Sequence, residues 1–167
     1  MRQVSPAEAF KRKYPEQIVL AVSADAAGRP DIITLGWAMP TSGRPPMLAI
    51  SVGHTRYSHG LIEKGGEFVL AFPSIQLAEA CMVCGSTSGR DTDKIKTANL
   101  RTAPAKVVRP PLLEGCLANF ECRVRSKLTT GDHTIFVGEV LASHVDESVS
   151  ERVYNIAGDF RAVQVKR

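Results

Sequence analysis

Aromatic residues are scarce in this chain. They make up 6% of its 167 residues, too few for a surface that binds single-stranded nucleic acid by stacking bases. No window approaches 18 uninterrupted apolar residues, so no membrane-spanning helix is predicted. Residues 1–17 lack the apolar core of a secretory signal peptide. We therefore expect a cytoplasmic protein with no membrane association.

The chain also lacks a concentrated charge of one sign. Its formal net charge is +4, but the 21 basic residues are scattered, and the longest cluster is Lys11, Arg12 and Lys13. A nucleic-acid-binding barrel needs basic residues gathered on one face, so nucleic acid is not expected as a partner. The apolar fraction of 44% and the length are those of a folded globular chain, and we expect one domain over residues 1–167.

Common cofactor and metal motifs are missing as well. No G-x-G-x-x-G follows the first predicted strand, which disfavours a Rossmann domain. Cys81 and Cys84 form a C-x-x-C pair, but Cys116 and Cys122 do not supply a second pair at zinc-ligand spacing. The sequence therefore predicts thiols that face the core from a helix, and no metal site. It leaves open whether Cys81 and Cys84 have a redox role.

Apolar alternation and turn residues indicate six or seven strands and three or four short helices. The predicted strands cover residues 17–23, 31–37, 47–52, 67–72, 112–127, 133–145 and 159–165. The predicted helices cover residues 5–13 with Ser5 as the N-cap, a turn at 60–64, residues 75–84, and a short helix capped by Asp91 or Thr92. Residues 38–46 are rich in Pro, Gly and Ser and are expected to form a turn.

The order of these elements favours a mainly β fold. Strands are grouped before and after a helical insertion, without the βαβ alternation of a parallel sheet. We therefore expect an antiparallel barrel with helices at its rim.

One stretch combines the features of a phosphate site. The strand at residues 47–52 is followed by His54, Thr55, Arg56, Tyr57 and Ser58, directly before the predicted helical turn. A guanidinium group, hydroxyls and a helix N-terminus at a strand end suit a bound phosphate. An isolated Arg56 would otherwise be interpreted as a surface residue.

Six sequence blocks together resemble the flavin-reductase-like family of FMN-binding split barrels, and most closely its flavoredoxin branch. The blocks are TLGW at 34–37, PPMLAISV at 45–52, TRYSHGLI at 55–62, GEFVLAFP at 66–73, SGRDTDKI at 88–95 and GDHTIFVGEV at 131–140.

The resemblance implies a homodimer of six-stranded antiparallel Greek-key split β-barrels with short peripheral helices, each holding one FMN. It also implies an oxidoreductase in which the flavin receives electrons from NADH, NADPH or an electron-donor protein. The family contains both NAD(P)H:flavin reductases and flavoredoxin-like electron carriers, and the match does not separate them. The alternative is a non-catalytic split-barrel binding module for haem or another ligand.

The resemblance assigns the phosphate of FMN to two segments of the chain. Thr55, Arg56, Tyr57 and Ser58 correspond to the phosphate-binding run of the family. In Ser88-Gly89-Arg90, the small residues let backbone N–H groups approach a phosphate, and Arg90 stands where the family usually keeps a base. Asp91, Asp93 and Lys94 are interpreted as structural, a helix start with a solvent-facing pair.

For the ring of the flavin, the resemblance places Trp37 beside the isoalloxazine, with a plain core role as the equal alternative. The hydroxyls of Thr34 and Ser51 are candidates for its polar edge, or for simple cross-strand pairing. Asp31 is included because a carboxylate near the ring would lower the reduction potential.

His133 matches a histidine that flavin reductases place near the nicotinamide pocket. It is the catalytic candidate, either for substrate binding or as a proton donor, and its alternative role is a bond to the adjacent Asp132. His54 has a weaker case.

Overall fold

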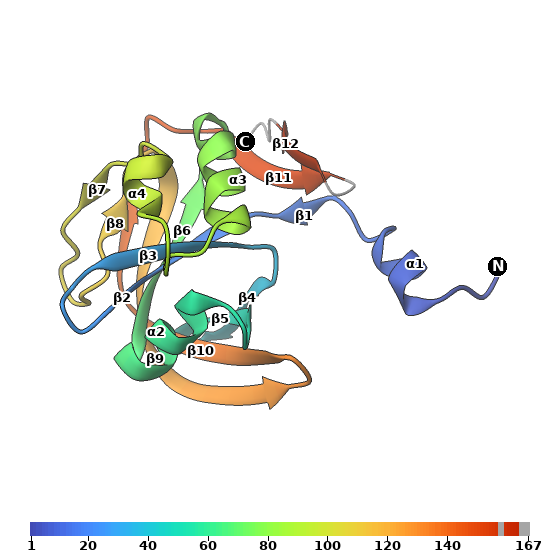
Figure 1. Ribbon diagram of the computed structural model, residues 1–167, viewed down its shortest axis with the longest axis horizontal. Helices are drawn as coiled ribbons and strands as arrows, with labels where there is room; N and C mark the ends of the chain where they lie inside the picture. The colour runs from blue at the N-terminus through green and yellow to red at the C-terminus, as the bar shows by residue number, and fades with distance from the viewer. Residues whose placement is uncertain (157–158, 164–167) are drawn as a thin grey trace.

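The computed structural model describes residues 1–156 and 159–163. Its main sheet is antiparallel and has seven strands, which follow one another in the order β3-β2-β6-β9-β10-β5-β4. In that order the strands are β3 (Pro30–Leu35), β2 (Val19–Ala24), β6 (Glu67–Pro73), β9 (Cys116–Thr130), β10 (His133–Val145), β5 (Pro46–Gly53) and β4 (Ala38–Gly43). The sheet curls strongly, and the long β9–β10 hairpin extends from its lower end (Figure 1).

Burial on both faces explains why β2 reads as a continuous apolar run. All six of its residues are buried. Leu20 and Val22 belong to a core between the sheet and α3 (Ala78–Ser86), whereas Val19 and Ala21 belong to a second core around Phe136. A strand covered on both faces loses the alternation of an edge strand.

The helices that follow β5 connect successive strands and pack against the main sheet. α2 (Tyr57–Gly65) follows β5 and contacts β2, while the short η1 (Ile75–Leu77) leads into α3, which packs on β3. The left-handed Gly66 (φ 67°) ends α2 and returns the chain to β6. α4 (Lys94–Thr97) lies beside α3 (Figure 1).

Two smaller sheets complete the fold. β1 (Glu16–Gln17), β11 (Arg152–Ile156) and β12 (Asp159–Val163) form one, in the order β1-β11-β12. β7 (Thr102–Ala103) and β8 (Leu112–Leu113) form the other. The predicted last strand is therefore found at 159–163, and its residues 164–165 lie outside the described part.

Three expectations need correction. Residues 38–43 are not a turn but the edge strand β4, which pairs with β5 and carries a bulge between Pro40 and Ser42. The main sheet therefore has seven strands rather than six. The short helix α4 is capped by Asp93, whose side chain accepts a hydrogen bond from the Lys96 N–H, and not by Asp91 or Thr92.

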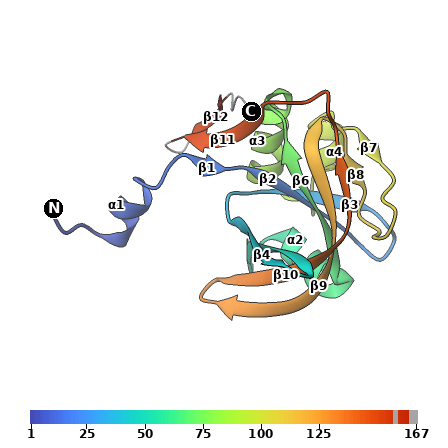
Figure 2. The same ribbon diagram turned by 180° about the vertical axis from the view of Figure 1, so that it is seen from behind.

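The first residues of the chain form an arm that projects away from the body. Its helix α1 (Pro6–Phe10) has the predicted Ser5 N-cap and contains no buried residue. Figures 1 and 2 show the arm from opposite sides, extending outward from β1. None of the helices in residues 1–156 or 159–163 is long and apolar enough to cross a membrane.

Candidate functional site

The chain turns from β5 into α2 around a small cavity of about 100 Å³, which we call the arginine cavity. Its lining is rich in hydroxyls and cationic groups, drawn from the β5–α2 connection and from the end of α3 and the loop after it. These residues are Thr55, Arg56, Tyr57, Ser58, Thr87, Ser88, Arg90 and Lys94, together with Ile33, Cys84 and Gly85. The two predicted phosphate segments therefore meet at one place.

Two guanidinium groups at this cavity have no acidic partner among the described residues. Arg56 is exposed at the N-cap of α2, and its side chain makes no capping bond. Arg90 is also exposed, and its guanidinium lies 5.5 Å from the centre of the Tyr57 ring. Unpaired cations beside hydroxyl donors suit a bound phosphate, because charge-assisted hydrogen bonds to anions are strong.

A buried ion pair supports the arginine cavity from below. Lys94 Nζ lies 3.2 Å from Asp31 Oδ1, and the two residues are only 5% and 3% exposed. Lys94 Nζ also donates to the Ile32 carbonyl at 2.6 Å and to the Cys84 carbonyl at 3.3 Å. The interpretation of Lys94 as part of a solvent-facing pair is therefore wrong, and sequence reasoning missed it as a residue of the site.

Asp31 does not line the arginine cavity or its neighbour. Its second carboxylate oxygen, Oδ2, accepts a hydrogen bond from the Ser58 hydroxyl. A Cβ atom at Gly89 would collide with Oδ1, so only glycine lets the loop approach Asp31 so closely. Asp31 thus positions Ser58, Lys94 and the Ser88–Arg90 loop rather than pointing at a ligand.

A second cavity of about 170 Å³, the Trp37 cavity, adjoins the first. The two share Ile33, Arg56 and Gly85. The remaining lining includes Trp37, Ser51, Thr34 and His133. The candidates for the flavin ring and those for its phosphate therefore line neighbouring cavities.

Two rings form one wall of the Trp37 cavity. The centres of the Trp37 and His133 rings are 4.8 Å apart, and their planes are inclined by 41°. Trp37 is 49% exposed and is therefore not a core residue, so the alternative of a core role is wrong. His133 Nδ1 bonds Asp132 Oδ1 at 2.6 Å, and this bond lowers the pKa of Asp132. The bond to Asp132 leaves Nε2 as the other ring nitrogen for a ligand.

Thr34 is already engaged with α3. Its hydroxyl donates to the Cys81 carbonyl at 2.6 Å, which fixes the helix against β3. The bond to Cys81 is neither the flavin contact nor the cross-strand pairing that the sequence suggests for Thr34. The Thr34 hydroxyl oxygen can still accept a hydrogen bond. Gly85 packs against the same side chain, where a Cβ would lie 3.3 Å away.

The four thiols are core groups. Cys81 and Cys84 are buried on the inner face of α3, as the sequence predicts. Burial raises the pKa of Cys81 to about 12 and that of Cys84 to about 11. A thiol that stays protonated at neutral pH is a poor nucleophile and metal ligand.

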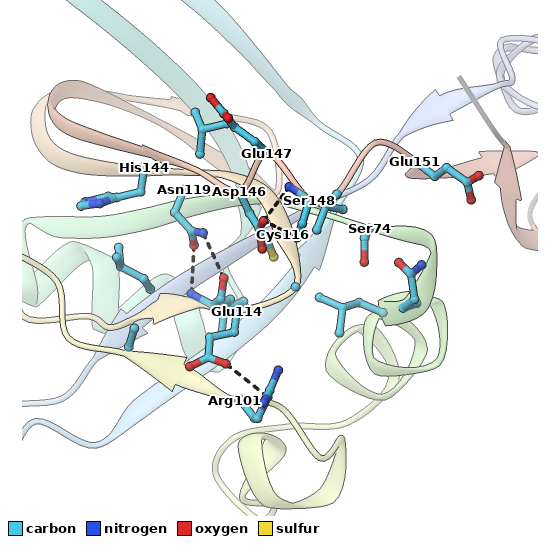
Figure 3. A pocket seen from close by; sticks show the side chains of 18 of the residues that line it. Ser74, Arg101, Glu114, Cys116, Asn119, His144, Asp146, Glu147, Ser148 and Glu151 are labelled. Atoms are coloured by element: carbon cyan, nitrogen blue, oxygen red, sulfur yellow. Dashed lines mark hydrogen bonds and ion pairs between the residues drawn. The ribbon is translucent and has the colours of Figure 1, made fainter. Parts of the chain in front are cut away.

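A larger cavity, of about 880 Å³, lies elsewhere, beside η1 and the end of β10 (Figure 3). Its lining includes the carboxylates of Glu114, Asp146, Glu147 and Glu151 and one guanidinium, Arg101. Several of these groups already have partners: Arg101 forms an ion pair with Glu114, and Asp146 accepts a hydrogen bond from the Ser148 hydroxyl. An acidic lining repels a phosphate, so size alone does not mark the site.

The chain thus forms an antiparallel sheet that carries a cation-lined cavity next to a cavity lined by two aromatic rings. The family model for the flavin reductase like domain matches residues 11–164, so the chain belongs to that family. An uncharacterized protein of Archaeoglobus fulgidus is 41% identical over 128 residues, which cover 77% of this chain and 71% of that protein. A flavin reductase of Pseudomonas putida is 25% identical over 146 residues, covering 87% and 82%.

Solved structures agree with this assignment. An FMN-binding protein from Thermus thermophilus has a TM-score of 0.84 at 25% identity, covering 97% of this chain and 94% of that one. A flavoredoxin from Methanosarcina acetivorans has a TM-score of 0.73 at 27% identity, covering 89% and 76%. An NADH:FAD oxidoreductase of Streptomyces globisporus C-1027 shares the fold, with a TM-score of 0.85 at 22% identity and 96% coverage of both chains.

Proposed function

We propose that the chain, as one domain over residues 1–167, is a cytoplasmic flavoprotein oxidoreductase that binds one FMN. The observation that carries this proposal is the pair of guanidinium groups, Arg56 and Arg90, which have no acidic partner within the described part of the chain and lie at a cavity that adjoins the Trp37 cavity. The donor set fits a phosphate, and the adjoining space with Trp37 and His133 fits an aromatic ring. The likeness to the FMN-binding protein of Thermus thermophilus supports the same ligand.

The residues at the arginine cavity would hold the phosphate. Arg56 and Arg90 would supply charge, and Thr55, Tyr57 and Ser88 would supply hydroxyl donors. Ser58, whose hydroxyl proton goes to Asp31, would line the phosphate site beside them. Asp31 and Lys94 keep the two segments together from below, and Gly89 allows their close approach.

The residues at the Trp37 cavity would orient the ring. Trp37 would cover it, and Ser51 and the acceptor side of Thr34 would meet its polar edge. A bound flavin supplies hydride and single-electron chemistry, which no side chain provides. His133, fixed by Asp132, would bind the electron donor or hold a proton at Nε2.

Electrons would come from NADH, NADPH or an electron-donor protein, and the active form would be a homodimer. The likeness to the Pseudomonas putida flavin reductase favours flavin reduction as the activity. Whether the protein reduces free flavin or relays electrons as a flavoredoxin does is decided by the acceptor.

The test is reconstitution followed by anaerobic reduction. Purified protein is mixed with FMN and desalted; we expect a yellow protein whose single tryptophan, Trp37, is quenched. Bleaching by NADH or by NADPH then identifies the donor. A colourless protein with undiminished tryptophan emission would contradict the proposal, and haem bound instead would support the binding-module alternative.

A further inference from the structure

The cavity of about 880 Å³ beside η1, which we call the Ser74 cavity, has no part in the proposed flavin site (Figure 3). It shares no lining residue with the arginine cavity or the Trp37 cavity. Its volume is that of a site for a small molecule. Its walls come from the end of β6 with η1, from residues 99–103, from the β8–β9 connection, and from the end of β10 with the residues up to 151. Segments far apart in the chain thus line one space that the proposed function does not use.

One buried polar group faces the Ser74 cavity without a partner. Ser74 is 1% exposed and lines the cavity, and its hydroxyl makes no hydrogen bond within the described part of the chain. Figure 3 shows the Ser74 side chain pointing into the space beside η1. Ser74 stands at the N-cap of η1, but its hydroxyl does not cap that helix. Because buried hydroxyls are normally hydrogen-bonded, Ser74 indicates a polar ligand.

The lining of the Ser74 cavity is negatively charged. One guanidinium, Arg101, stands among the described lining residues and lies 3.2 Å from Glu114. Asp146 Oδ1 accepts hydrogen bonds from the N–H and the hydroxyl of Ser148, and these bonds lower the pKa of Asp146. Asp146 therefore stays ionised at neutral pH, and its Oδ2 is left for a cation. The carboxylates of the lining belong to Glu114, Asp146, Glu147 and Glu151.

The same cavity also has an apolar side. Leu112 and Leu113 are buried core residues that line it, and Leu77 packs against the same core. Within residues 1–156 and 159–163, no group of three His, Cys, Asp or Glu side chains could hold a metal ion. Carboxylates next to aliphatic side chains suit a ligand that carries ammonium groups on a methylene chain. An organic amine therefore fits this lining better than a metal ion does.

We propose that the Ser74 cavity binds an aliphatic polyamine, with one ammonium group held by the Asp146 carboxylate and the Ser74 hydroxyl. An ammonium group donates several hydrogen bonds and accepts none, so it can pair with both oxygens. The methylene chain would lie against Leu112 and Leu113. Charge-assisted hydrogen bonds are strong, and the one to Asp146 would supply most of the specificity.

Isothermal titration calorimetry of the full chain with spermidine tests the proposal, with Ser74→Ala and Asp146→Asn as variants. Asparagine keeps an acceptor for the bonds from Ser148 and removes the charge. We expect each variant to bind spermidine at least about 10-fold more weakly, because each loses a hydrogen bond to a charged group. Asp25→Asn is the matched control, since Asp25 Oδ1 accepts a bond from the Ala27 N–H in a similar turn outside the cavity. Asp25→Asn should bind spermidine as the wild type does.

Two further measurements separate this site from diffuse attraction of cations to an acidic surface. Replacing NaCl by MgCl₂ at equal ionic strength should leave spermidine binding nearly unchanged. Without spermidine, Ser74→Ala should be at least as resistant to thermal unfolding as the wild type, because the hydroxyl that it loses has no partner.

Four results would overturn the proposal. The first is that the wild type does not bind spermidine, and the second is that Mg²⁺ abolishes the binding. The third is that Asp25→Asn weakens the binding as much as Asp146→Asn does. The fourth is a loss of stability in Ser74→Ala without spermidine, which would mean that the Ser74 hydroxyl already has a partner in the folded chain.

Discussion

Lys94 Nζ lies 3.2 Å from Asp31 Oδ1, and both side chains are buried beneath the arginine cavity. The pair joins β3 to α4, the helix that follows the Ser88–Arg90 segment, and the same Asp31 carboxylate accepts a hydrogen bond from Ser58 of the other segment. The geometry of the proposed phosphate site therefore depends on a charge pair that itself lies under the site.

Removing one charge of this pair should destabilise the folded protein. Lys94→Met leaves the Asp31 carboxylate buried without its cation, and we expect the free energy of unfolding to fall by about 3–5 kcal/mol in denaturant titration. Arg101→Met is the control, because its partner Glu114 is exposed and such pairs contribute about 0–1 kcal/mol. The double variant Lys94→Met/Asp31→Asn should recover part of the loss. Equal effects of Lys94→Met and Arg101→Met would contradict the assignment.

Gly89→Ala should weaken FMN binding more than it alters the rest of the protein. The added methyl group would collide with the Asp31 carboxylate and approach Tyr57, so the Ser88–Arg90 loop must move outward. Overpacking of this kind costs about 1–3 kcal/mol. Gly60→Ala is the matched control, because a Cβ there meets nothing within 4 Å. Fluorescence titration with FMN checks the prediction, which fails if the two variants bind FMN equally well.

How much the sequence predicted depends on how local the signal is. The strand His133–Val145 has the predicted bounds, because alternation and the Gly131-Asp132 turn are local features. β4 was missed because Pro40 and Gly43 suggest a turn, yet an edge strand tolerates proline. β11 was also missed, since its register with β1 brings together residues far apart in the chain.

The site followed the same pattern. Arg56 and Arg90 were predicted as phosphate ligands because family motifs surround them, and the structure brings them to one cavity. Lys94 was not, because a lysine just after a helix N-cap resembles a surface residue, and its burial depends on Asp31, 63 positions earlier in the chain. A charged residue with a distant partner leaves no local signal.

His133→Ala should retain FMN and slow its reduction by NADH or NADPH by about 10-fold or more, since a positioned acid or base contributes at least that much. The ring lines the Trp37 cavity and is held by Asp132. Stopped-flow absorbance measures the rate. His54→Ala serves as the control, because His54 is exposed and does not line the Trp37 cavity. Reduction at the wild-type rate would remove His133 from the reaction.

Glu121 should make the free energy of unfolding depend on pH in the acidic range. Burial alone would raise the pKa of Glu121, but hydrogen bonds from the Lys106 N–H, from His144 and from two further backbone N–H groups outweigh it and lower the pKa. A lowered pKa means that its contribution is present above the unfolded value of about 4.3 and is lost as the pH falls through the folded value.

Thermal unfolding from pH 7 to pH 3 measures this contribution. Glu121→Gln should be destabilised by about 2 kcal/mol near neutral pH, and its difference from the wild type should shrink on acidification. Glu147→Gln, at an exposed position, is the control and should show little difference at any pH. A Glu121→Gln difference that stays constant with pH would contradict the account.

The central claim is that Arg56 and Arg90 bind the phosphate of a flavin, and the most direct test compares FMN with riboflavin, which lacks that phosphate. We expect the wild type to bind FMN much more tightly than riboflavin. Arg56→Ala and Arg90→Ala should each weaken FMN binding by roughly 10- to 100-fold, or about 1.5–3 kcal/mol, and leave riboflavin binding nearly unchanged. Arg101→Ala should match the wild type. Equal affinity for the two flavins, unaffected by either arginine, would contradict the account.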